Sequence, residues 1–109
     1  MTSDLRVLAG LDRLIHEPSR LMILTVLYAK AEADFVYLQK VWKFSKGNLS
    51  SHLAKLEKAG YVQVAKGFKG KYPLTVCRLT KKGRDAFEGY AQQLKSVSRA
   101  ADGSKSSGS

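Results

Sequence analysis

Lysine and arginine are the side chains whose number and spacing in this sequence point to a chemistry. Twelve of them fall between residues 40 and 84, where Glu57 is the one acidic side chain, so this segment carries a net charge of +11. The flanking segments carry −1 (residues 1–39) and 0 (residues 85–109). A positive field this concentrated is typical of a surface that binds a polyanion, because each neutralised phosphate releases condensed counterions. A merely soluble basic surface is the alternative that charge alone leaves open.

The other reactive residue types are too few or too scattered to indicate catalysis or metal binding. His16 and His52 have no cysteine beside them and no paired carboxylate, so we expect neither a metal site nor a cofactor. Cys77 is the single cysteine and alternates with Thr75 and Leu79, as a buried strand residue would; a redox-sensing thiol is the less favoured alternative. The sequence has no Ser-His-Asp set and no phosphate-binding glycine loop, so we do not expect an enzyme.

Length and composition favour one folded domain. The chain has 109 residues, of which 44% are hydrophobic and 26% charged, and a chain of this size buries one compact core. No apolar run approaches the roughly 18 residues of a membrane-spanning helix, and the N-terminus lacks the basic start and apolar core of a signal peptide. We therefore predict a reduced, cytoplasmic protein without membrane contact. We expect its domain over residues 1–99 and a disordered Ser/Gly-rich tail over residues 100–109.

Periodicity of the apolar residues predicts the elements that position the basic segment. Helical spacing covers Asp4–Ile15, Arg20–Lys30, Tyr37–Phe44, Lys46–Ala59 and Lys81 to about Val97, with Phe35 and Val36 as a short extended piece. Ser45 and Gly60 are suitable as the N-cap and the stop of the fourth of these helices, and Thr80 can cap the last.

The alternating pattern after Gly60 predicts a two-stranded hairpin. Its strands are Tyr61–Ala65 and Leu74–Leu79, and its tip is Gly67–Gly70. Pro73 lacks a backbone donor, so the second strand should begin as an edge or after the proline. Phe68 at the tip is either a wedge against sugar or base or an aromatic ring that covers the base of the hairpin.

Two helices joined by a tight turn and followed by a basic hairpin form a helix-turn-helix with a wing. We therefore predict an α+β, mainly helical fold, a winged helix-turn-helix with a two-stranded wing and a C-terminal dimerisation helix. In the helix Lys46–Ala59, a leucine stripe occupies one side, while Asn48, Ser51 and Lys55 lie opposite it. Such side chains can bind base edges and phosphates, although an ordinary solvated helix face is the alternative.

Three segments of the sequence carry a family resemblance over roughly residues 12–95. They are EPSRLMILTVLY, KFSKGNLSSHLAKLEKAGYV and KGFKGKYPLTVCRLTKKGRDAF, and they resemble the small MarR/ArsR-like winged-helix transcriptional regulators. The resemblance implies a dimeric DNA-binding repressor or activator, with repression favoured. It also implies a recognition helix over residues 46–59 in the major groove, a wing over residues 66–71 on the backbone or in the minor groove, and dimerisation through the terminal helices. The sequence does not support a small-molecule effector.

The predicted site residues form two sets. The expected contacts to double-stranded DNA are Lys43, Ser45, Lys46, Asn48, Ser50, Ser51, His52, Lys55, Lys66, Lys69 and Lys71, of which His52 is equally well interpreted as a boundary packing residue. The expected homodimer interface consists of apolar residues on the terminal helices, namely Leu8, Leu11, Ile15, Phe87, Tyr90, Ala91 and Leu94. A winged helix used for protein interaction, or for RNA binding in a transcription complex, is the alternative function. The strong positive charge disfavours the first of these unless the partner is acidic.

Overall fold

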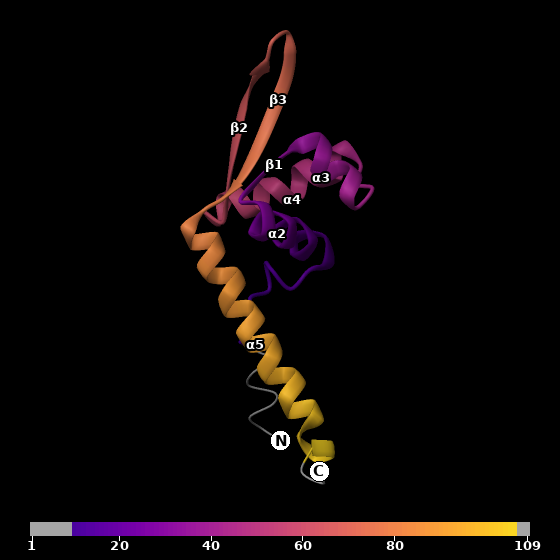
Figure 1. Cartoon of the computed structure of the whole chain (residues 1–109), viewed down its shortest axis with the longest axis vertical. Coiled ribbons are helices and arrows are strands. Elements are labelled where there is room, and N and C mark those ends of the chain that lie inside the picture. Colours follow the sequence, from indigo (N-terminus) through magenta and orange to yellow (C-terminus); the bar gives the residue numbers. More distant parts are fainter. Residues whose placement is uncertain (1–9, 107–109) are drawn as a thin grey trace.

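The computed structural model describes residues 10–106 and forms a helical body with a projecting hairpin and a long C-terminal helix (Figure 1). The elements in chain order are α2 (Pro18–Lys30), β1 (Glu32–Asp34), α3 (Phe35–Val41), α4 (Lys46–Lys58), β2 (Val62–Lys69), β3 (Tyr72–Leu79) and α5 (Lys81–Ser106). The predicted α+β, mainly helical, winged helix-turn-helix architecture is confirmed.

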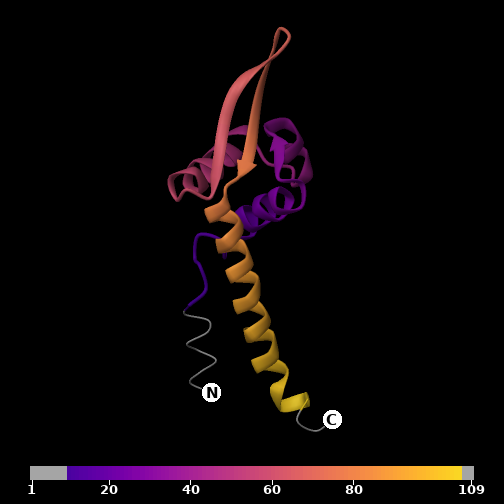
Figure 2. The same cartoon turned by 60° about the vertical axis from the view of Figure 1, so that its left-hand side comes forward.

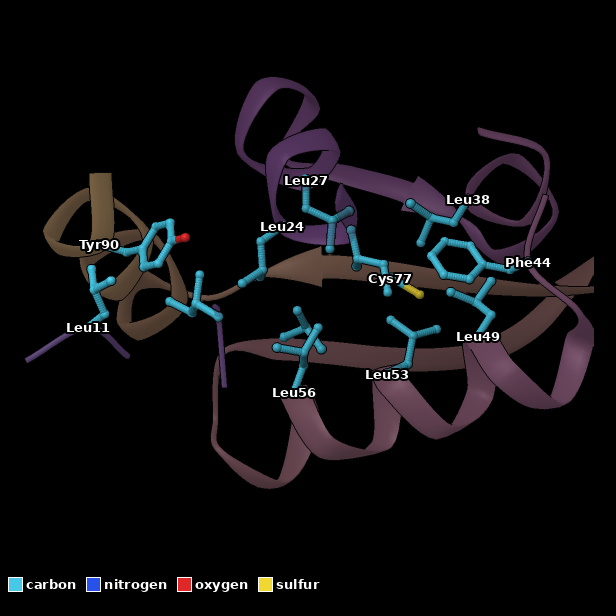
Figure 3. Packing of buried hydrophobic residues seen from close by; sticks show 13 residues of the cluster. Leu11, Leu24, Leu27, Leu38, Phe44, Leu49, Leu53, Leu56, Cys77 and Tyr90 are labelled. Atoms are coloured by element: carbon cyan, nitrogen blue, oxygen red, sulfur yellow. The ribbon is translucent and has the colours of Figure 1, made fainter. Parts of the chain in front are cut away.

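The core forms between α2 and α4, with the sheet completing it. Figure 3 shows Leu24 and Leu27 of α2 opposite the leucines of α4, with Cys77 of β3 beside them. Leu24, Leu27, Leu49 and Cys77 are all 0% exposed. Because α2 is apolar on nearly every side, it can be covered by α4, α5 and the sheet at once, as the sequence predicts for a central helix.

The turn between α3 and α4 and the two ends of α4 follow local chemistry. The hydroxyl of Ser45 accepts a hydrogen bond from the backbone N–H of Asn48 at 3.1 Å, which caps the helix. Gly60 follows the helix at φ +83°, a conformation that glycine adopts without steric cost. Lys43 in the preceding turn also has a positive φ, of 52°. The predicted N-cap and stop of α4 are therefore confirmed, and the helix ends at Lys58, one residue before the predicted end.

The sheet has three antiparallel strands in the order β1-β3-β2. The predicted position of the extended piece was wrong: the strand is Glu32–Asp34, and Phe35 already begins α3. Asp34 sets this boundary, because its carboxylate accepts a hydrogen bond from the N–H of Tyr37 at 2.8 Å while its backbone is paired in register with Val76.

The hairpin is longer than predicted and its tip is tighter. β2 continues to Lys69, which pairs with Tyr72, so the turn is Gly70–Lys71 rather than Gly67–Gly70. Gly70 has φ +65°, as the first central residue of a two-residue hairpin turn requires. Pro73 lies within β3 at a level where β1 is absent, so the missing donor is tolerated at a locally free edge.

The N-terminal segment departs from the predicted helix Asp4–Ile15. Residues 10–17 form turns and bends, and residues 4–9 lie outside the described part of the chain. The carboxylate of Asp12 accepts hydrogen bonds from the N–H groups of Leu14 and Ile15, at 2.9 and 3.3 Å. This local turn competes with a helix, and it directs Leu11 and Ile15 into the core.

The last helix, α5, extends away from the body (Figure 2). Thr80 caps it as predicted, since its hydroxyl accepts a hydrogen bond from the N–H of Gly83 at 2.9 Å. The helix runs to Ser106, whereas the sequence predicts an end near Val97 and disorder from Ala100 onward. Adding residues to an existing helix has little of the cost of nucleating one, which accounts for the helical residues 100–106.

Candidate nucleic-acid interface

The exposed face of α4 lies opposite the leucines that anchor the helix. Leu49, Leu53 and Leu56 are at most 3% exposed, whereas Asn48, Ser51 and Lys55 are exposed. The leucines fix the rotation of the helix about its axis. Its outer face therefore presents hydrogen-bonding and cationic side chains in a defined direction.

The N-terminal end of α4 adds a second cationic feature. Lys43 and Lys46 flank Ser45, and all three residues are exposed. The Ser45 hydroxyl oxygen is engaged as the cap, while its O–H group retains a donor. The unpaired N–H groups of the first helical turn give this end a partial positive charge that favours a phosphate.

The wing lies beside α4 and leaves a groove between them. This groove is lined by Phe35, Lys46, Ser50, Leu53, Ala54, Glu57, Val64, Lys66 and Thr75. The structure thereby brings together Lys46, Ser50 and Lys66, three residues predicted separately on the helix and the wing. Lys69 and Lys71 lie farther out, at the exposed tip. The predicted contact residues other than His52 thus lie exposed on α4, the turn before it, or the wing.

His52 does not lie on the exposed face. Its side chain is 16% exposed, and its Nδ1 atom lies 3.2 Å from Arg20 Nη1 and 3.5 Å from Glu17 Oε2. Its ring also lies near Phe44, at 6.2 Å between ring centroids. Burial lowers the pKa of His52 below its ordinary value. This placement supports the boundary packing role and not the DNA contact.

Two cations of the basic segment are engaged elsewhere. Arg78 pairs with Glu32 at 3.3 Å, across β1 and β3, and Lys81 pairs with Asp85 at 3.1 Å along α5. The charge of these two cations is therefore partly offset by the neighbouring carboxylates. Cys77 is 0% exposed, and burial raises the pKa of its thiol to about 11, so it is not an accessible thiolate.

The wing tip holds an aromatic residue that the sequence reasoning missed. Tyr72 is 78% exposed, and Phe68, on the other strand, is 74% exposed. Phe68 therefore does not cover the base of the hairpin, which was one of its two interpretations. The strand register could have located Tyr72. With Gly70–Lys71 as the turn, Tyr72 is the first residue of β3 and lies at the wing tip.

A family comparison identifies this arrangement. The model of the winged helix DNA-binding domain matches residues 19–98, from α2 through most of α5. The chain belongs to the winged helix DNA-binding domain family. The matched residues include the helix-turn-helix and the whole wing.

Individual proteins that are similar to this winged-helix protein in sequence or in structure support the family assignment. An uncharacterized protein of Methanocaldococcus jannaschii is 34% identical over 88 residues, which is 80% of this chain and 95% of the relative. A transcriptional regulator homologue from Pyrococcus horikoshii OT3 superimposes with a TM-score of 0.83 at 30% identity, covering 92% of this chain and 98% of that one. A MarR-family regulator from Silicibacter pomeroyi shares the fold, with a TM-score of 0.62 at 17% identity over 91% of this chain and 66% of that one. The resemblance to MarR/ArsR-like winged-helix regulators is confirmed.

The predicted interface residues of the winged helix fall into two groups. Leu11, Ile15 and Tyr90 are at most 7% exposed and belong to the core of the same chain. Phe87 is partly buried against that core, where its ring lies 4.9 Å from the ring of Tyr28. Ala91 is half-buried on α5, and Leu94, farther along the helix, is 42% exposed. Leu8 lies outside the described residues.

Residues 10–106 of this winged helix include no helix that is long and apolar enough to cross a membrane. Within the same range, no three His, Cys, Asp or Glu side chains gather in a way that could hold a metal ion.

Proposed function

We propose that this protein is a homodimeric, cytoplasmic transcriptional regulator that binds double-stranded DNA in a sequence-specific way. One observation carries the proposal: α4 presents Asn48, Ser51 and Lys55 to solvent beside the exposed lysines of the wing. This combines groups that can read base edges with groups that can bind phosphates, on one side of a winged helix.

The dimensions of B-form DNA suit this surface. The major groove is about 12 Å wide and admits one α-helix, so α4 enters it with Asn48 and Ser51 toward the base edges. An asparagine can form two hydrogen bonds with adenine, whereas a serine discriminates less between bases. Lys46, Lys66 and Lys69 then face the phosphates that border the groove, and the wing follows the backbone or enters the minor groove.

In the proposed homodimer, the outer part of α5 forms the interface. Leu94 is 42% exposed on a helix that extends beyond the body, so its apolar surface is available to a second copy without disturbing the core (Figure 2). Two-fold symmetry would place two recognition helices about 34 Å apart and would select a palindromic site. Occupying such a site excludes other proteins from it, which is the action of a repressor.

A gel-shift titration tests the DNA binding. Duplex DNA enriched from a random pool should bind tightly and random duplex DNA weakly, while double-stranded RNA should bind with at most the affinity of random DNA. Tighter binding to RNA, or no binding to either nucleic acid, would favour the RNA-binding or protein-interaction alternative instead.

Light scattering tests the dimer. The wild-type protein at tens of micromolar should have twice the mass of the chain, and Leu94→Glu should have the mass of the monomer with an unchanged circular dichroism spectrum. Gln92→Glu introduces the same charge at another exposed position of α5 and serves as the matched control. A monomeric wild-type protein would refute the dimer.

A further inference from the structure

Most of the exposed large hydrophobic side chains in the described part of the chain lie together on α3. Val36, Tyr37, Val41 and Trp42 are each between 37% and 54% exposed, and we refer to these four residues as the α3 patch. The helix is held on the core through its other side, by Leu38, which is 1% exposed. None of the four patch residues belongs to the core or to the residues packed against it. The fold therefore does not account for them.

The α3 patch forms one side of a short helix. Tyr37 and Val41 are four residues apart, so their side chains are neighbours on the helix surface, and Trp42 follows as the C-cap. The helix lies at the edge of the helical body, away from α5 (Figure 1), and thus outside the proposed dimer contact. A contiguous exposed apolar patch on a soluble domain marks an interaction site, and tryptophan and tyrosine are enriched among the residues that dominate binding at protein interfaces.

Lysine side chains border the α3 patch. The Nζ atom of Lys30 lies 4.9 Å from the centroid of the Tyr37 ring. Lys40 and Lys43 line a hollow together with Val36 of the patch. Within residues 10–106 none of these three lysines forms an ion pair, and the sequence from 35 to 46 has no acidic residue. The patch is therefore an apolar surface with a positive rim.

This rim determines which occupant suits the patch. A second copy of the chain does not, because in a two-fold contact the same surface meets itself and Lys30 and Lys40 would face the same lysines of the other copy. The phosphates of a nucleic acid suit the lysines but leave the four apolar side chains without an apolar partner. A protein segment that carries both apolar side chains and carboxylates satisfies both parts of the surface.

We propose that the α3 patch binds an acidic amphipathic segment of a partner protein. Aliphatic or aromatic side chains of the segment cover Tyr37, Val41 and Trp42, while its carboxylates pair with Lys30 and Lys40. The helix is about 10 Å long, so two to three turns of a partner helix span it. This function does not depend on the proposed DNA binding, because it uses a different helix from the one that presents the proposed base contacts.

The emission of Trp42 tests whether the patch is the binding surface, since it is the single tryptophan of the chain. The probe is a synthetic peptide of about eleven residues, or three helical turns, with Leu and Phe along one face, Asp and Glu elsewhere and no tryptophan. Titrating this peptide should shift the Trp42 emission to shorter wavelength in a saturable way. A peptide with lysine at every acidic position should cause no shift.

Two substitutions with matched controls test the apolar and the charged part of the contact. Tyr37→Ala and Lys40→Glu should each weaken binding of the fluorescein-labelled acidic peptide about fivefold to tenfold, measured by anisotropy. Tyr72→Ala removes an exposed tyrosine on the wing, and Lys58→Glu reverses an exposed charge at the end of α4. Both controls should keep the affinity for the peptide within about twofold of wild type. Thermal melting checks that every variant folds.

Several results would overturn the inference. The first is the absence of saturable peptide binding up to about 1 mM. The second is an equal loss of affinity in Lys40→Glu and Lys58→Glu without a shift of the Trp42 emission, which would indicate a general attraction to the basic surface. If Tyr37→Ala and Lys40→Glu weaken binding to duplex DNA but not to the peptide, the patch belongs to the DNA interface. If they lower the mass measured by light scattering, it is an interface between copies. Because the peptide is titrated without DNA, failure of the proposed DNA binding leaves this result readable on its own.

Discussion

Replacing Gly83 with alanine should destabilise the protein although alanine is the better helix former. Gly83 lies in the first turn of α5, where the helix passes the backbone of Tyr61. A Cβ atom at this position would lie 2.1 Å from the Tyr61 carbonyl oxygen and 2.8 Å from its carbonyl carbon. Thr80 holds the two segments together, since its N–H and its hydroxyl both donate to that carbonyl at 3.1 Å. The clash is with backbone, so no side-chain rotation relieves it.

The magnitude follows from two opposing effects. Helix propensity alone favours alanine over glycine by about 0.8–1 kcal/mol. Overpacking typically costs about 1–3 kcal/mol, and a contact this short with backbone places Gly83→Ala at the upper end or beyond. We therefore expect the free energy of unfolding to fall by about 2 kcal/mol, as the difference between the two effects.

Gly89 provides the matched control. It lies in the same helix, it is exposed, and a Cβ atom there would meet nothing within 4 Å. Gly89→Ala should raise the free energy of unfolding by about 0.8–1 kcal/mol. Urea titrations followed by circular dichroism, at one fixed protein concentration, measure both changes. Equal stabilisation by the two substitutions would refute the close approach of α5 to Tyr61.

Four further predictions concern the interface and pH. Lys43→Gly should raise the free energy of unfolding by up to about 1 kcal/mol, because glycine adopts the positive φ of this position without strain. The same substitution should weaken DNA binding. Urea titration measures the stability and gel-shift titration the affinity, and an unchanged affinity would exclude Lys43 from the interface. Changing Lys69 and Lys71 to alanine should weaken binding to all duplexes and flatten the log–log salt slope by about 0.9 per lost phosphate contact; a changed specificity at constant slope would argue against backbone contacts. Asn48→Ala should reduce the preference for the selected site by about 1–3 kcal/mol in a competition titration at fixed salt, and an unchanged ratio would place base readout elsewhere. Burial and a hydrogen bond to an aspartate raise the pKa of Tyr61 to about 12. In the unfolded chain the Tyr61 hydroxyl ionises near pH 10, so the free energy of unfolding should fall progressively between pH 10 and 12. Tyr61→Phe should remove that part of the decline in pH-dependent urea titrations.

The helix-turn-helix was predictable because its signals are local. The cap at Ser45, the stop at Gly60 and the leucine spacing of α4 each depend on residues within one or two helical turns. The wing was predictable in outline for the same reason. Its turn was misplaced because Gly67 and Gly70 both permit a tip, and only the strand register decides between them.

The misplaced elements depend on contacts between distant residues. β1 consists of Glu32, Ala33 and Asp34, which have no strong strand propensity, and it forms through pairing with β3 more than 40 residues later. The assignment of Leu11 and Tyr90 to a dimer interface has a related origin. Periodicity shows that a side chain belongs to an apolar face, but it does not show whether its own chain or a second copy covers that face.

The position of Asp34 links the wing to the helix-turn-helix. Its backbone is paired with β3 of the wing while its carboxylate caps α3, so the first helix of the helix-turn-helix begins where the sheet ends. The base of the wing is therefore tied to the helix that precedes α4. If the protein binds DNA as we propose, a mismatch between the spacing of α4 and the wing and the spacing of adjacent grooves favours deformation of the DNA. Sequences that bend or twist easily would then be favoured even at base pairs that no side chain touches.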